Sequence, residues 1–185
     1  KSSIEKATNY GIKLAGFCLD FLKTATPVEA EGLSFGQLAI DLKTKRDPSR
    51  VPEAERIIEL HAQGRDLEFA PTQKQANYML AESKKIVGLE KSKEDYRSTA
   101  VSAIAFCGLA FVGIPGEPFN EVGVQIRKNS KFPVTCVMCQ ANGCHGYYPT
   151  AEGYDQGGYE SYNTPYVKGT AEQLADTADK LVATL

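Results

Sequence analysis

One carboxylate stands in an unusual setting for a turn. Glu117 follows the apolar run Leu109–Ile114 and lies between two prolines, in the segment Pro115-Gly116-Glu117-Pro118. The run predicts a strand, and Pro118 suits the first position of a following helix, so Glu117 is expected where a strand passes into a helix. Ligands of layered α/β folds bind at the carboxyl ends of strands, where the sheet holds side chains rigidly. Glu117 is therefore either a residue that shapes the turn or a functional carboxylate.

A second stretch with chemical potential is the segment from Cys136 to Tyr166. It contains six tyrosines, several glycines and His145, directly after a predicted strand. Loops rich in Tyr and Gly present hydroxyl groups on rigid rings along an adaptable backbone, which is common in ligand sites. The alternative is a surface Ω-loop packed by its own rings.

The same segment allows a zinc interpretation through Cys136, Cys139, Cys144 and His145. Structural zinc sites usually join two closely spaced ligand pairs across a longer loop, a pattern that these four residues do not follow. If the strand continues through Cys136 and Cys139, their side chains point to opposite faces. A redox Cys-x-x-Cys site would need a helix start that lowers the thiol pKa. His61 is expected to be a surface histidine.

Hydrophobic periodicity predicts the elements that must position these residues. The run Val101–Phe106 and the run after it flank Cys107-Gly108, which predicts a hairpin, and the strand Leu33–Leu42 is expected at a sheet edge because a charged segment follows it. The other predicted elements are a helix at about Ser3–Lys23, a helix after Pro118, a strand at Phe132–Cys139 and a helix at Thr170–Leu185. This order predicts an α/β fold, a layered mixed sheet flanked by helices.

Residues from about 43 to 97 differ in character from the rest. Charge runs alternate there with apolar patches at helical spacing, one after Pro52 and one after Thr72, which is a plausible N-cap. We expect two amphipathic surface helices in a charged insertion. It is either a solvated addition or a cap over a neighbouring cleft.

Composition sets further bounds. The chain has 185 residues, 42% hydrophobic and 24% charged, with a net charge of -2, which argues against nucleic-acid binding. No apolar run reaches the roughly 18–20 residues that span a bilayer. Five cysteines, an odd number, favour a reducing compartment, so we predict a cytoplasmic location. The start at Lys1, without Met, suggests that the chain is a fragment of a longer protein.

Two segments together resemble a known family. The sequence FVGIPGEPFNEVG, followed some thirty residues later by ANGCHGYYPTAEGYDQGGYES, resembles the C-terminal part of the catalytic domain of the neutral/alkaline non-lysosomal ceramidase family, particularly its bacterial members. The resemblance covers the chain from about Ser3 and is strongest from Leu109 to Ser161. It implies a zinc-dependent amidohydrolase of sphingolipid metabolism that hydrolyses an N-acyl amide bond, with a small-molecule or lipid substrate.

The resemblance also implies roles for individual residues. Glu117 matches the family's glutamate zinc ligand, and Tyr147, in Tyr147-Tyr148-Pro149-Thr150, matches its tyrosine ligand. Tyr159 matches a further tyrosine near the reaction centre, which we assign as catalytic. A zinc ion that keeps one coordination position open for water lowers the pKa of that water enough to supply hydroxide near neutral pH.

The family's remaining zinc ligands are two histidines from the N-terminal part of the domain. Only His61 and His145 occur here, and neither stands in a matching motif. We therefore expect an N-terminal half of the same protein to supply the histidines, and this chain alone to be inactive. Two other hypotheses stay open: a non-catalytic ligand-binding or scaffold module without metal, and a structural zinc domain built on the cysteines.

Overall fold

The computed structural model describes residues 3–29 and 31–185, which fall into two compact units divided between Glu31 and Gly32. The first unit contains helix α1 (Ile4–Leu22), close to the predicted bounds. Ser3 caps it, because its hydroxyl accepts a hydrogen bond from the Lys6 amide at 3.2 Å. Within the described residues, no helix is both long enough and apolar enough to cross a membrane.

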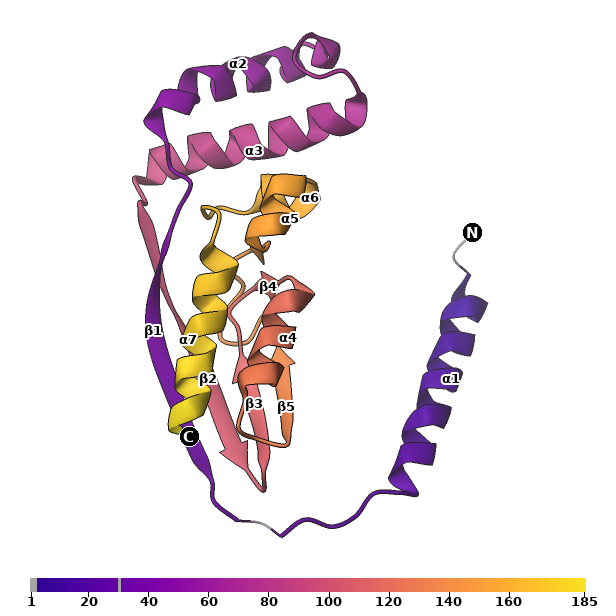
Figure 1. Ribbon diagram of the computed structural model, residues 1–185. Coiled ribbons are helices and arrows are strands. Elements are labelled where there is room, and N and C mark those ends of the chain that lie inside the picture. The colour runs from indigo at the N-terminus through magenta and orange to yellow at the C-terminus, as the bar shows by residue number, and fades with distance from the viewer. Residues whose placement is uncertain (1–2, 30) are drawn as a thin grey trace. The chain divides into compact units, whose positions relative to one another are not determined.

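The second unit is built on a mixed four-stranded sheet (Figure 1). Its strands are β1 (Ser34–Lys43), β2 (Tyr96–Phe106), β3 (Leu109–Gly113) and β5 (Val134–Met138), in the order β1-β2-β3-β5. The β1–β2 and β2–β3 pairs are antiparallel, and β3–β5 is parallel. The predicted α/β class and the predicted edge position of β1 are both confirmed.

The hairpin between β2 and β3 has the predicted turn. Cys107 and Gly108 have φ angles of 53° and 74°, the two positive values that a type I′ turn requires. Strand β2 nevertheless starts at Tyr96, earlier than the predicted Val101, because its polar first residues pair with the end of β1, with Lys43 opposite Tyr96. Backbone pairing thus extends the strand into a segment whose composition predicted the insertion.

Two helices cover one face of this sheet (Figure 1). They are α4 (Asn120–Asn129) and α7 (Thr170–Thr184), and both present apolar faces to the strands. The core between them and the sheet includes the fully buried side chains Leu42, Val101, Val112, Ile114, Ile126, Leu174 and Val182. Burial of these side chains rigidly supports the end of β3, beyond which Glu117 lies.

The prediction that Pro118 opens a helix is wrong. Glu117 and Pro118 form a two-residue strand, β4, and Phe119 is the residue that precedes α4. The Phe119 amide donates to the Tyr148 carbonyl at 3.1 Å, so the ladder holds Pro118 in an extended conformation. A contact with a distant segment therefore delays the start of the helix.

The charged insertion forms a pair of helices, α2 (Val51–Ala62) and α3 (Gln73–Ser92), with short 3-10 turns η1 (Pro48–Arg50) and η2 (Asp66–Glu68). Thr72 caps α3 as predicted, accepting from the Gln75 amide at 3.2 Å. The two helices pack against each other, and α3 also lies beside α6 (Figure 1).

The Tyr-rich segment contains regular secondary structure, which a surface Ω-loop lacks. It contains strand β6 (Tyr147–Tyr148) and two short helices, α5 (Ala151–Gln156) and α6 (Tyr159–Asn163). Thr150 caps α5 by accepting from the Gly153 amide at 3.1 Å.

Candidate functional site

The structure places Glu117 and Tyr147 side by side. Strands β4 and β6 pair in parallel, with Glu117 opposite Tyr147, and the Glu117 amide donates to the Gly146 carbonyl at 2.9 Å. Paired residues of a ladder project to the same face, so the carboxylate and the phenol share one side of this small sheet. Two residues chosen from separate sequence motifs therefore form one site, just beyond the carboxyl end of β3.

Gly116 makes this arrangement possible. A Cβ at this position would lie 2.5 Å from the Gly146 carbonyl oxygen and 2.5 Å from Cε2 of Tyr148, and its φ angle is 154°. The absence of a side chain at Gly116 thus permits this close approach of the backbone. Two further hydrogen bonds fix the turn. The Tyr148 hydroxyl donates to the Pro115 carbonyl at 3.0 Å, and the backbone amide of Gln140 donates to the Gly116 carbonyl at 2.8 Å.

Among the residues that the structure describes, Gln140 is the side chain that bonds to the Glu117 carboxylate. The Gln140 side-chain amide donates to its Oε1 at 2.9 Å, and the Glu117 side chain is half-buried. Because Gln140 follows β5, it reaches Glu117 from the neighbouring strand end. A carboxylate oriented by an amide donor retains a second oxygen for a further partner.

Tyr159 completes a cluster of three predicted residues. The Tyr147 and Tyr159 rings meet edge to face, with centroids 5.6 Å apart and an interplanar angle of 73°. Tyr159 starts α6 and is half exposed, at 50%. A hydrogen bond from Thr164 fixes the Tyr147 backbone, since the Thr164 hydroxyl donates to the Tyr147 carbonyl at 2.7 Å.

Hydrogen bonding with Tyr159 raises the pKa of the Tyr147 phenol, and desolvation and the Glu117 carboxylate raise it further. Each of these favours the neutral phenol over a phenolate. At neutral pH the chain by itself thus holds a protonated phenol beside Glu117.

The insertion anchors the helix that carries Tyr159. Buried Lys45 donates through Nζ to the Tyr162 carbonyl at 3.0 Å, and Tyr78 of α3 stacks on Tyr162 with ring centroids 5.5 Å apart. The Lys45 ammonium also lies 3.6 Å from Glu82 of α3. Helix α3 is therefore a structural support for α6, a role that neither interpretation of the insertion included.

The cysteines do not form a metal site with His145. Cys136, Cys139 and Cys144 are all exposed and free. Across residues 3–29 and 31–185, no group of three or more His, Cys, Asp or Glu side chains is placed to hold a metal ion. His61 is partly exposed and pairs with Asp66, Nδ1 to Oδ1, at 2.8 Å.

The site can act as a pair of oxygen donors with an adjacent phenol. Glutamate and tyrosine oxygens suit zinc, which takes N, O or S ligands, but a catalytic zinc site needs about three protein ligands. Glu117 and Tyr147 thus fit a part of such a donor set. At least one further ligand is needed from outside this cluster.

Sequence reasoning missed three residues that build the site: Gln140, Thr164 and Lys45. Each acts through a partner distant in sequence, so no local pattern marks it. The helix α5 had a detectable signal, because Thr150 precedes it as an N-cap residue.

Comparison with known proteins gives limited matches. No protein-family model matches the chain, and no curated protein does. One similar solved structure is described as ceramidase complexed with C2, with 22% identity and a TM-score of 0.44 over 47% of this chain and 15% of that chain. A neutral ceramidase from Pseudomonas aeruginosa matches with 23% identity and a TM-score of 0.41, over 48% of this chain and 16% of the other. The chain thus spans a small part of the length of both.

Proposed function

We propose that this chain supplies Glu117 and Tyr147 as zinc ligands, and Tyr159 as a catalytic phenol, to an amidohydrolase that cleaves an N-acyl amide bond in the manner of neutral ceramidases. The proposal rests on one observation above all. Three residues singled out by their motifs lie together, Glu117 opposite Tyr147 in a ladder and Tyr147 in ring contact with Tyr159.

The proposal requires a histidine-bearing partner, the N-terminal half of the same protein. Described residues of this chain offer no group of three or more His, Cys, Asp or Glu side chains for a metal. Two imidazoles added to a carboxylate and a phenol would give four protein ligands of the N and O types that zinc takes. A zinc ion bound there would supply activated water at neutral pH.

The chain's own residues have separable tasks in this proposal. Glu117, oriented by Gln140, would hold the metal through a carboxylate oxygen. Tyr147 would contribute its phenol oxygen, which would be a better metal ligand after loss of its proton. The half-exposed Tyr159 hydroxyl donates a hydrogen bond to the substrate carbonyl oxygen as negative charge develops on it.

The test is metal content and N-acyl amide hydrolysis of the longer protein, measured beside this chain. We expect about one zinc per molecule and turnover in the longer protein, and neither in this chain. Glu117→Ala and Tyr147→Phe should each lose zinc and activity. Tyr159→Phe should retain zinc and lower the rate roughly 100-fold or more, as expected for removal of an oxyanion donor.

Matched controls separate these effects from general damage. Glu121→Gln removes an exposed carboxylate from the first turn of α4, and Tyr96→Phe removes the hydroxyl of an exposed tyrosine in β2. Both should leave zinc content and rate unchanged. A longer protein that binds no zinc and hydrolyses no N-acyl amide would refute the proposal.

The alternative is a non-catalytic module that binds a small ligand or acts as a scaffold without metal. Its supporting observation is that the site residues are already held by protein hydrogen bonds, such as Gln140 to Glu117 and Thr164 to Tyr147. Under this alternative, supplying histidines from another segment changes neither stability nor ligand binding.

A further inference from the structure

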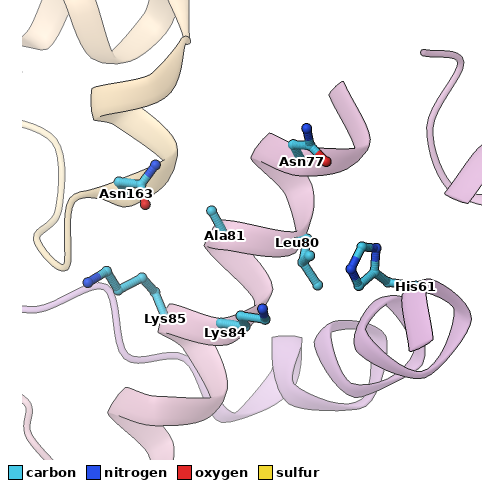
Figure 2. Close-up of a pocket in the computed structure, with 7 residues that line it drawn as sticks. All are labelled: His61, Asn77, Leu80, Ala81, Lys84, Lys85 and Asn163. Carbon is cyan, nitrogen blue, oxygen red and sulfur yellow. The ribbon is translucent and has the colours of Figure 1, made fainter. Parts of the chain in front are cut away.

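A groove of about 560 Å³ runs along one face of α3 in the insertion. Its floor comes from α3, with His61 of α2 at one side and Asn163 of α6 at the other (Figure 2). None of the described residues that line it is acidic, and two are lysines. The groove is separate from the Glu117 site, although both use α6.

The lining residues of α3 form two rows at helical spacing. Asn77, Ala81 and Lys85 follow each other at intervals of four residues, and Leu80 and Lys84 form a second, parallel row. Figure 2 shows Lys85 extending on the side of Asn163, and the His61 ring facing Leu80. The floor is thus apolar in its middle and cationic towards the C-terminal end of α3.

The two lysines have no carboxylate partner within the part of the chain that the structure describes. The acidic residues of α3 are engaged elsewhere. Glu82 lies 3.6 Å from Lys45 and 3.2 Å from Arg50, and Glu90 pairs with Arg46 at 2.9 Å. Two neighbouring positive charges beside a concave surface attract an anion.

Polar groups at the margins add directed hydrogen bonding. Nδ1 of His61 forms a hydrogen bond with the Asp66 carboxylate, which leaves Nε2 free for a ligand. Nε2 is an acceptor when the ring is neutral and a donor when the ring is protonated. The Asn77 carbonyl accepts from Gln73 at 3.3 Å, which leaves the Asn77 amide as a donor. Asn163 already donates to the Tyr159 carbonyl at 2.9 Å, so the margin of the groove is fixed to α6.

We propose that this groove binds a small amphipathic organic anion. Lys84 and Lys85, at one end of the groove, attract its carboxylate or phosphate oxygens, and a short alkyl portion lies along Leu80 and Ala81 towards Asn77. Lysine binds either kind of anion as a point charge, so the two head groups share the same recognition chemistry. The proposal requires no metal at Glu117.

The test is calorimetric titration of the chain with octanoate, octyl phosphate and the neutral probe octanol. We expect saturable 1:1 binding of at least one anion, weakening as salt rises, and much weaker binding of octanol. Comparison of the two anions identifies the head group. Replacing both lysines, Lys84→Gln with Lys85→Gln, should weaken anion binding roughly tenfold or more through loss of two charge-assisted contacts.

Two further variants make the result specific. Lys91→Gln with Lys128→Gln removes the same charge from exposed lysines that do not line the groove, and should change binding less than roughly twofold. Lys84→Arg with Lys85→Arg should retain anion binding. The proposal is overturned if neither anion binds saturably, if octanol binds as tightly, or if the glutamine pair binds like the parent. Because no zinc is involved, failure here is independent of the zinc proposal.

Discussion

Substitution of Gly116 tests the physical basis of the candidate site most directly. Gly116→Ala would place a methyl group 2.5 Å from both the Gly146 carbonyl oxygen and Cε2 of Tyr148. The first contact is with backbone that belongs to the β4–β6 ladder, and the second is with a ring that is fully buried. Neither neighbour can move away without disturbing the pairing of Glu117 with Tyr147.

The expected cost follows from these contacts. Forcing a methyl group into a well-packed site costs about 1–3 kcal/mol, and an alanine at a φ angle of 154° adds about 1–3 kcal/mol of backbone strain. We therefore expect Gly116→Ala to lower the free energy of unfolding by about 2–6 kcal/mol. The measurement is urea unfolding followed by circular dichroism, with the m-value checked for constancy.

Gly88 provides the matched control. It lies inside α3, its φ angle is not positive, and a Cβ added there would meet no atom within 4 Å beyond its chain neighbours and the adjacent backbone of its own helix. Gly88→Ala should therefore stabilise the protein by up to about 1 kcal/mol, because alanine is the better helix former. If Gly116→Ala cost less than about 0.5 kcal/mol, the argument that close backbone approach builds this site would be refuted.

Three further predictions concern the supports of the site. Burial lowers the pKa of Lys45 to about 8, from 10.5, so the unfolded chain binds more protons between these values and stability rises with pH. The free energy of unfolding should be about 2 kcal/mol higher at pH 9.5 than at pH 7.5, and Lys45→Met should abolish this difference. An equal difference in Lys45→Met would show that it does not arise from Lys45. Thr164→Val removes the donor to the Tyr147 carbonyl and should cost about 1–3 kcal/mol in urea unfolding, whereas a neutral result would show that the bond is dispensable. Thr150→Ala removes the cap of α5 and should cost about 1 kcal/mol, with Thr150→Ser retaining most of the stability; equal loss in both variants would exclude capping as the cause.

Local patterns predicted most of the secondary structure. The apolar periodicity of α7, the cap at Thr72 and the Cys107-Gly108 turn each depend on residues close in sequence, and each appears as expected. The errors lie where distant segments meet. Pro118 remains in a strand because Tyr148 pairs across from it, and β2 starts at Tyr96 because β1 continues opposite it.

For the candidate site too, the sequence indicated the residues and the tertiary structure determined their contacts. The sequence by itself placed Glu117 at the end of β3 and six tyrosines in the Tyr-rich segment, and the resemblance of its motifs to a known family singled out Tyr147 and Tyr159 among them. Only the tertiary structure decided that they meet, since the β4–β6 ladder joins residues thirty positions apart. The tertiary structure likewise brought the Gln140 side chain into hydrogen-bonding distance of Glu117, and Lys45 into hydrogen-bonding distance of the Tyr162 carbonyl in α6. Such contacts depend on long-range pairing and packing, which no local spacing encodes.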